Sequence, residues 1–179
     1  MKTSAKDYYT LTYKTSFDTN EVPYNGTWTN SAKATWTDIN GDTHENSGSA
    51  GFTPKVEFDN DGSKSGSYNA TNKTITWTVV ANYNQRTLTD ATISDQIVGD
   101  QDYVSDSAKL YEATINSNGT YTLGAQVSSP DITFDSDSNT LTAKLPEGST
   151  KAYVLTYETS LAGKVIDQSS YTNTAKYTN

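Results

Sequence analysis

The sequence predicts an all-β protein with the architecture of a β-sandwich, and three observations support this fold class. The 179-residue chain has 33% hydrophobic residues, 13 tyrosines and 3 tryptophans, set among many threonines and serines, which suits half-buried pleated strands. Short segments of alternating apolar and polar residues recur at regular spacing, and no segment shows the periodicity of an amphipathic helix. Polar turn signals separate these segments, and many short strands joined in this way favour a sandwich.

The first four expected strands lie between residues 8 and 98. Residues 8–16 and 26–36 combine tyrosine or tryptophan with threonine. Residues 74–81 and 91–98 are richer in isoleucine and valine. Each segment is bounded by residues that favour turns, so each is expected to be a separate strand.

Four further strands are expected in the C-terminal half, at residues 108–115, 139–145, 151–160 and 170–178. All of them show the period-two alternation of a half-buried strand. Each of the turn signals between strands contains Asn, Asp, Gly or Pro. They lie at residues 40–42, 60–62, 118–119, 130–131, 137–139 and 146–148.

Charge and composition exclude several classes of function. The net charge is −8 and the pI is about 4.5, so the clustered Lys and Arg of a nucleic-acid-binding surface are not expected. No apolar run reaches the length of a membrane span, and no apolar segment of signal-peptide type follows the opening Met-Lys-Thr. The chain has no cysteine, which excludes disulfides, thiol catalysis and a cysteine zinc site.

The sequences of two consecutive predicted strands occur twice in the chain. "YTLTYKTS" at 9–16 matches "YVLTYETS" at 153–160, and "WTNSAKAT" at 28–35 matches "YTNTAKYT" at 171–178. The offsets are 144 and 143 residues, and a nearly constant offset over two strands indicates a repeated domain. We therefore predict that residues 1–50 are the C-terminal strands of a preceding copy plus a junction. Residues 51–179 are predicted to form a nearly complete copy.

The alternation also places polar side chains on apolar strand faces. Asp95 shares a face with Ile93 and Ile97, and Asn173 shares a face with Tyr171. Burying an amide without partners costs about 2–7 kcal/mol, and burying a charge costs more. Asp95 and Asn173 therefore need partners, either as ordinary hydrogen-bonded core residues or as reactive groups. Lys64, set between small residues in "GSKSGSYN", is a candidate partner.

Residues 55–179 resemble a known family in three pieces, in order along the chain. These are the Lys-x-Gly start at "KSG", the strand "TISDQI" and the asparagine in "YTNTAKY". They are similar to the collagen-adhesin-type (Cna-like) domains of Gram-positive cell-wall-anchored adhesins. The resemblance implies an immunoglobulin-like (DEv-IgG) β-sandwich, used as a tandem-repeat module at the cell surface. It also implies an intramolecular isopeptide bond from Lys64 to Asn173, with Asp95 as the assisting acid and proton shuttle.

The implied chemistry is physically reasonable for buried residues. A lysine amine attacks an amide carbon only when it is neutral, and burial disfavours its charged form. Burial likewise favours the protonated form of a carboxyl group, so Asp95 could donate to the Asn173 amide oxygen and then move protons as ammonia leaves. The reaction runs once per molecule, so the protein is not expected to be an enzyme with turnover. No cofactor is implied.

Other assignments of the reactive residues remain open. Lys55 is a rival for the amine, since it precedes the predicted 56–58 strand. Asn30 occupies the same place in the first copy as Asn173 in the second, and its lysine is expected in the missing part of that copy. A metal site is not expected. The stretches 59–62 and 135–139 resemble calcium loops only faintly and are expected to be turns, and His44 lies alone in a polar loop.

The expected location is extracellular, at a cell wall, with a stalk favoured over a ligand-binding head. The expected partners are neighbouring repeats of the same protein and a host matrix protein such as collagen, or a glycan. The alternative is a carbohydrate- or matrix-protein-binding sandwich without a cross-link, using exposed aromatic residues such as Tyr83, Tyr103 and Tyr121. An accessory domain of a hydrolase is a third, less favoured reading.

Overall fold

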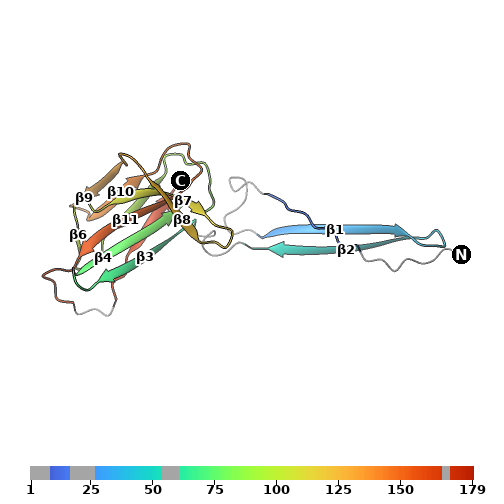
Figure 1. Cartoon of the computed structure of the whole chain (residues 1–179), viewed down its shortest axis with the longest axis horizontal. Helices are drawn as coiled ribbons and strands as arrows, with labels where there is room; N and C mark the ends of the chain where they lie inside the picture. Colours follow the sequence, from blue (N-terminus) through green and yellow to red (C-terminus); the bar gives the residue numbers. More distant parts are fainter. Residues whose placement is uncertain (1–8, 17–26, 54–60, 167–169) are drawn as a thin grey trace.

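The computed structural model describes residues 9–16, 27–53, 61–166 and 170–179, and all of its regular secondary structure is β-strand. Residues from 61 onward form two antiparallel sheets packed face to face, and residues 28–52 form a separate two-stranded ribbon (Figure 1). The predicted all-β sandwich of immunoglobulin-like type is confirmed. None of the described segments contains a helix of the length and hydropathy that a membrane span requires.

The strands run in sequence order from the ribbon to the last edge of the sandwich. Their bounds are β1 Trp28–Thr37, β2 Thr43–Phe52, β3 Gly62–Asn69, β4 Thr74–Ala81, β5 Thr92–Gln96, β6 Asp102–Tyr103, β7 Lys109–Ile115, β8 Tyr121–Gln126, β9 Ile132–Asp135, β10 Thr140–Lys144, β11 Ala152–Ser160 and β12 Thr174–Thr178.

The larger sheet has the order β3-β4-β11-β7-β8, with β6 pairing the end of β11. Its central strands β4 and β11 alternate apolar and threonine residues, so one face of each strand is buried. Trp77 and Tyr157 lie opposite each other across this pair, and both point into the core. The strand β3 pairs only with β4 among the described strands, and so forms one edge of this sheet.

The smaller sheet has the order β12-β5-β10-β9. In β5 the residues Ile93 and Asp95, followed by Ile97, face inward and are at most 2% exposed. The sheet begins at β12, which pairs with β5 from Thr174 onward. The edges β3 and β12 lie next to each other, because β12 makes its contacts with the other sheet at β3.

The core lies between the two sheets and contains side chains from both. Its fully buried members include Leu155 from the larger sheet and Ile93 and Leu141 from the smaller one. Because each sheet covers the apolar face of the other, the polar side chains on these inward faces are shielded from water. Lys64, Asp95 and Asn173 belong to the elements that bound this interior.

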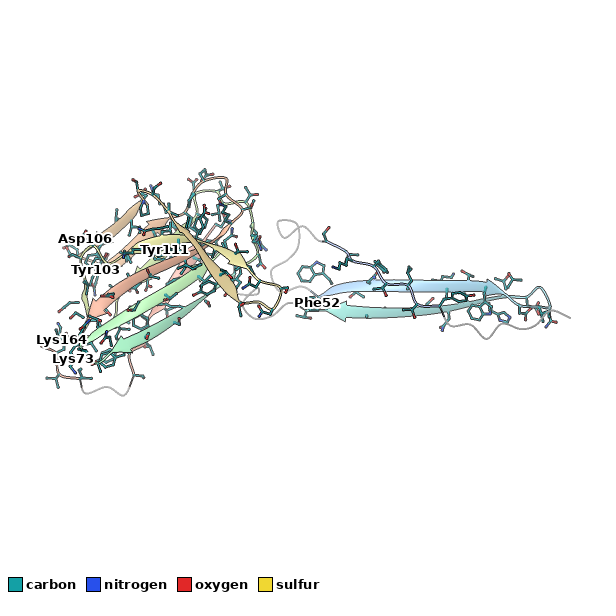
Figure 2. The ribbon with its side chains drawn as sticks, in the orientation of Figure 1. Phe52, Lys73, Tyr103, Asp106, Tyr111 and Lys164 are labelled. Atoms are coloured by element: carbon teal, nitrogen blue, oxygen red, sulfur yellow. The ribbon has the colours of Figure 1, made fainter. Side chains whose placement is uncertain are left out.

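The ribbon β1–β2 pairs from Trp28 opposite Phe52 to Thr37 opposite Thr43. Its turn is held by the Asp38 carboxylate, which accepts the backbone N–H groups of Asn40 (2.8 Å) and Asp42 (3.0 Å). Almost every residue of the two strands is exposed. Figure 2 shows Phe52, which is 62% exposed, at the end of the ribbon nearest the sandwich.

The structure corrects two expectations about strands. The described residues 9–16 form no strand, and they have no ladder partner. The expected strand 170–178 is shortened to Thr174–Thr178, because its neighbour β5 ends at Gln96, opposite Thr174. Asn173 therefore lies just before the last strand, not within it. The predicted division of the chain into residues 1–50 and 51–179 stays a prediction.

Five strands were not among the expected ones: β2, β3, β6, β8 and β9. Of these, β3 matters most, because it carries Lys64. Its "GSKSGSYN" sequence contains two glycines and little apolar character, so its period-two pattern is weak. It is ordered by pairing with β4 over all eight of its positions, from Gly62 opposite Ala81 to Asn69 opposite Thr74.

Candidate cross-link site

The structure brings Lys64, Asp95 and Asn173 into one hydrogen-bonded network with a fourth residue, Tyr157. Lys64 comes from the edge strand β3, Asp95 from β5, Tyr157 from the central strand β11, and Asn173 from the segment just before β12. The network therefore joins both sheets. The rival amine, Lys55, lies outside the described residues.

Lys64 is held in an aromatic setting with little access to water. Its side chain is 11% exposed, and its Nζ lies 4.9 Å from the centroid of the Trp77 ring and 5.5 Å from that of Tyr157. The Nζ donates to Asp95 Oδ2 and to Tyr157 OH, the latter at 3.1 Å. Burial lowers the pKa of Lys64, and the hydrogen bond and charge of Asp95 oppose this shift without cancelling it.

Side-chain packing explains why the third residue of the Lys-x-Gly motif, Gly66, is a glycine. Gly66 lies opposite Trp77 in the β3–β4 ladder, and a Cβ at Gly66 would lie 2.8 Å from the indole ring. The absence of that Cβ lets the indole lie beneath β3, beside the Lys64 amine. The indole is held in place because its Nε1 donates to Thr159 Oγ1 at 3.0 Å.

Asp95 is completely buried, between Ile93 and Ile97 on the inward face of β5. Its Oδ2 accepts from Lys64 Nζ and from Tyr157 OH, the latter at 2.7 Å. Its Oδ1 is also buried but has no hydrogen-bond partner. A buried oxygen without a partner is costly, and a proton on it would turn it into a donor.

Asn173 presents its side-chain amide to the same cluster. Its Nδ2 donates to Tyr157 OH at 2.7 Å, and its Oδ1 is buried without a partner. The cluster thus contains two unpartnered oxygens, one on the carboxyl group of Asp95 and one on the amide of Asn173. Donation from an Asp95 O–H to the Asn173 carbonyl oxygen would satisfy both and would polarise the amide.

Tyr157 is the member of the site that sequence reasoning missed. Its hydroxyl accepts from Lys64 and Asn173 and donates to Asp95, which uses the full hydrogen-bonding capacity of a phenol. Burial, with the charge of Asp95, raises its pKa well above the ordinary value, so it stays protonated. One signal could have found it. The tyrosine recurs in both copies of the repeat, as Tyr13 and Tyr157.

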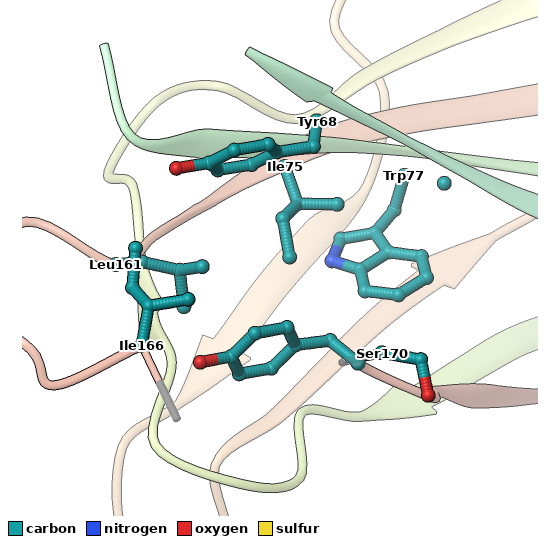
Figure 3. A pocket seen from close by; sticks show the side chains of 8 residues that line it. Tyr68, Ile75, Trp77, Leu161, Ile166 and Ser170 are labelled. Atoms are coloured by element: carbon teal, nitrogen blue, oxygen red, sulfur yellow. The ribbon is translucent and has the colours of Figure 1, made fainter. Parts of the chain in front are cut away.

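Three hollows lined by described residues adjoin the cluster. One, of about 450 Å³, is lined by Tyr68 of β3, Trp77 of β4 and Tyr171, two residues before Asn173 (Figure 3). Another, of about 310 Å³, is lined by Lys64 among others. A smaller one, of about 170 Å³, is lined by Asn173 and Gln96 among others.

The other candidate features of the sequence are accounted for by local structure. In the stretch 135–139, Asp135 accepts from the N–H of Asp137 (2.9 Å) and the hydroxyl of Ser138 (2.7 Å), so it forms a turn, as expected. Residues 59 and 60 of the other calcium-like stretch lie outside the described residues. Within the described segments, no group of three His, Cys, Asp or Glu could hold a metal ion. His44 Nε2 lies 3.0 Å from Asp38 Oδ2 at the exposed ribbon turn.

One expectation about aromatic residues is wrong. Tyr83, Tyr103 and Tyr121 were expected to be exposed and available to a ligand. Tyr83 is 4% exposed, Tyr103 stacks on Phe134 with ring centroids 4.4 Å apart, and Tyr121 packs against a second apolar cluster around Val154. These three tyrosines are therefore structural residues. The expectation was wrong because the alternation pattern alone does not show which sheet faces are covered.

The fold and the site define a β-sandwich domain of immunoglobulin-like type whose two edge strands meet at a buried Lys–Asp–Tyr–Asn cluster. Residues 59–179 match the family model of the collagen binding domain, and the chain belongs to this family. The predicted resemblance to collagen-adhesin-type domains is thereby confirmed. Among curated proteins no sequence matches the chain.

Several solved structures are similar to the chain. The collagen-binding domain from a Staphylococcus aureus adhesin is 20% identical, covering 65% of this chain and 83% of that one, with a TM-score of 0.48. The collagen binding domain of the Erysipelothrix rhusiopathiae surface protein RspB is 18% identical, covering 83% and 49%, with a TM-score of 0.48. The collagen binding subdomain of the Enterococcus faecalis surface protein ACE is 14% identical, covering 65% and 93%, with a TM-score of 0.43.

Proposed function

We propose that the domain is a structural and adhesive module of a bacterial cell-surface protein, closed by an isopeptide bond that it forms itself between Lys64 and Asn173. The observation that carries this proposal is the buried cluster. It holds an amine with a lowered pKa, an acid and an amide around one tyrosine hydroxyl. Two buried oxygens of this cluster lack partners until a proton is shared between them.

The proposed reaction exchanges one amide nitrogen for another. Neutral Lys64 Nζ attacks Asn173 Cγ, while Asp95 in its acid form donates through Oδ1 to the Asn173 oxygen. Asp95 Oδ2, which already accepts from the Lys64 amine, takes the proton that Nζ loses. That proton goes to Asn173 Nδ2, the Cγ–Nδ2 bond breaks, and ammonia leaves. As the new amide carbonyl forms, its oxygen returns the donated proton to Asp95. The new Nζ–Cγ amide is the cross-link, and no oxidant or cofactor enters the balance.

The bond would connect the two sheets at their neighbouring edges, β3 and β12. Lys64 lies on the edge β3 of one sheet, and Asn173 precedes the edge β12 of the other. A link between them closes a loop of about 100 residues, which stabilises the fold by about 4.7 kcal/mol if it is treated by the chain-entropy model for disulfides. A force applied through the chain ends would then meet a covalent bond between the first and last strands of the domain.

Intact-mass spectrometry tests the bond directly. We expect the purified chain to be lighter than its sequence mass by one ammonia, and the Lys64→Ala and Asn173→Ala variants to show the full sequence mass. Lys176→Ala is the matched control, because Lys176 is an exposed lysine of β12, the strand that follows Asn173. Peptide mapping should find residue 64 joined to residue 173. A wild-type chain with its full sequence mass would refute the cross-link.

We propose an extracellular, cell-wall-attached location and a load-bearing stalk role, supported by the family and by the position of the cluster between the edge strands. Binding to collagen or another matrix protein is the family-based expectation for a partner. Surface plasmon resonance on immobilised collagen would test it. No saturable binding by a correctly cross-linked chain would leave the stalk role and remove collagen as its ligand.

A second candidate is ligand binding at the aromatic hollow, with or without the cross-link. It is favoured by one observation: Tyr68, which is 47% exposed, and Tyr171 line the 450 Å³ hollow over Trp77 (Figure 3). An exposed tyrosine ring and a partly buried one beside an apolar floor suit a sugar ring or an apolar peptide side chain. Tyr68→Ala should weaken binding to a glycan or matrix protein and leave the ammonia loss intact. Equal binding by the variant would exclude this hollow.

A further inference from the structure

A hydrogen bond of the cross-link site occurs a second time, in the N-terminal part of the chain. Asn30 Nδ2 donates to Tyr13 OH, just as Asn173 Nδ2 donates to Tyr157 OH. Tyr13 and Asn30 are the counterparts of Tyr157 and Asn173 in the repeated sequence, at offsets of 144 and 143 residues. The amide and the tyrosine that holds it are therefore repeated as a pair in three dimensions.

The surroundings of the two pairs differ completely. Tyr9, Leu11 and Tyr13 are 90%, 84% and 54% exposed. Their counterparts Tyr153, Leu155 and Tyr157 are 2%, 0% and 0% exposed, because they form the inward face of β11. The side chains at 9–13 thus carry the sequence of a core strand without a core to cover them.

Within the described segments, Asn30 and Tyr13 are hydrogen-bonded to each other and to no amine or carboxyl group. The nearest lysine along β1, Lys33, lies on the opposite strand face from Asn30, where its Nζ is 2.6 Å from Glu45 Oε2. In the sandwich the amine and the acid come from β3 and β5, and β11 is flanked by β4 and β7. All four of these elements lie within residues 61–152.

We propose that the segments 9–16 and 27–37 are the acceptor half of a second cross-link site, with Asn30 as its acceptor and Tyr13 as its positioning residue. Its donor half is a copy of the 61–152 segment that precedes Tyr9 in the same polypeptide. This proposal rests on the proposed function of the Lys64–Asn173 site. The donor strands would cover Tyr9, Leu11 and Tyr13 and would supply the lysine and the aspartate.

The chemistry is the same exchange as in the complete domain. The lysine Nζ of the donor copy bonds to Asn30 Cγ, the Cγ–Nδ2 bond breaks, and the displaced nitrogen leaves as ammonia with the proton that the amine gave up. Asn30 keeps its full amide in the chain as it stands. The ribbon therefore behaves as an unreacted acceptor, which needs only a set of donor strands to react.

A duplication tests this inference. Residues 61–152 are added directly in front of Tyr9 of the chain, so that the added Ala152 precedes Tyr9 as Ala152 precedes Tyr153 in the intact domain. We expect the extended chain to lose two ammonias where the parent chain loses one. Hydrogen exchange should show residues 9–16 protected in the extended chain and open in the parent.

Three variants separate the possible outcomes. Asn30→Ala in the extended chain, or Lys64→Ala in the added copy alone, should abolish only the second ammonia loss. Asn173→Ala should abolish only the first. Protected residues 9–16 without a second ammonia loss would overturn the acceptor role of Asn30, and unprotected residues 9–16 would overturn the pairing itself. A parent chain that loses no ammonia would instead refute the proposed function, and the two failures are thus distinguishable.

Discussion

Residues 9–37 and residues 153–178 have nearly the same sequence but very different environments. In the C-terminal copy, β11 lies between β4 and β7, and Tyr157 is fully buried. In the N-terminal copy the matching segment 9–16 pairs with no strand, and Tyr13 is half exposed. The comparison teaches that an amphipathic strand pattern specifies a face but not a partner, because the ladder bonds and the core come from elsewhere in the chain.

The largest expected difference between the two copies concerns their asparagines. Asn173→Ala should remove the cross-link and lower the free energy of unfolding by about 4–5 kcal/mol, since the unfolded chain regains the entropy of an open loop of about 100 residues. Asn30→Ala should change it by less than about 0.5 kcal/mol, because Asn30 is exposed. Urea unfolding measures both changes. Equal losses in the two variants would contradict the assignment of the link to the C-terminal copy.

The tyrosines offer a second, smaller contrast. Tyr157→Phe removes the hydroxyl that joins Lys64, Asp95 and Asn173, and leaves buried polar atoms without a partner, which costs about 1–3 kcal/mol. It should also slow or prevent ammonia loss, because the amide is no longer held. Tyr13→Phe is the matched control in the other copy, and it should leave both the ammonia loss and the unfolding midpoint unchanged. Full ammonia loss in Tyr157→Phe at the wild-type rate would show that the hydroxyl does not position the amide.

The sequence allowed the strand faces of the candidate site residues to be predicted. Period-two alternation places Asp95 on the same face as Ile93 and Ile97 whatever strands lie beside it. It also allowed Asn173 to be singled out, since the amide sits among aromatic residues of one face. Tyr157 was missed because an inward tyrosine in a strand is ordinarily a core residue. The strand at 9–16 was wrongly expected because its own pattern is strong, while pairing depends on residues that are distant in sequence.

The choice of Lys64 could not be made from the strand pattern either. Its strand contains two glycines, and its order comes from pairing with β4. The structure supplied the reason for the neighbouring Gly66, which leaves space for the Trp77 indole beside the lysine. That space depends on Gly66 lying opposite Trp77 in the β3–β4 pairing, so it could not be predicted from the sequence of either strand alone.

Buried and exposed aspartates give the two regions opposite responses to pH. Burial raises the pKa of Asp61, at the start of the sandwich, to about 6, although the N–H of Asn84 and the charge of Arg86 oppose the shift. A raised folded-state pKa means that stability is present when the group is protonated and is lost as pH rises from about 4 to 6. The full effect is at most about 3 kcal/mol.

Asp61→Asn should remove this dependence and stabilise the sandwich at pH 7. The amide can still accept the Asn84 N–H, which lies 2.7 Å from Asp61 Oδ1, and asparagine tolerates the φ of 52° at this position. Asp106→Asn is the matched control, with a φ of 59° and an exposed side chain. Unfolding midpoints from pH 4 to pH 8 should fall for wild type and for the control and stay flat for Asp61→Asn. A falling curve in all three proteins would assign the dependence to another group.

The smallest expected effect concerns Asp38 at the ribbon turn. Its hydrogen bond with His44, and those with the backbone N–H groups of the turn, lower its pKa. A lowered folded-state pKa gives support that is present above the unfolded value and is lost as pH falls through the folded one. Below pH 4 the turn amides of Asn40 and Asp42 should therefore exchange faster, while the sandwich amides near Asp61 exchange more slowly. Amide hydrogen exchange at pH 3 and pH 6, corrected for the intrinsic rates, measures both regions in one sample. Separate local carboxyl groups predict that acid speeds exchange in the turn and slows it in the sandwich. If the exchange rates of both regions changed in the same direction, acid would be acting on the whole molecule.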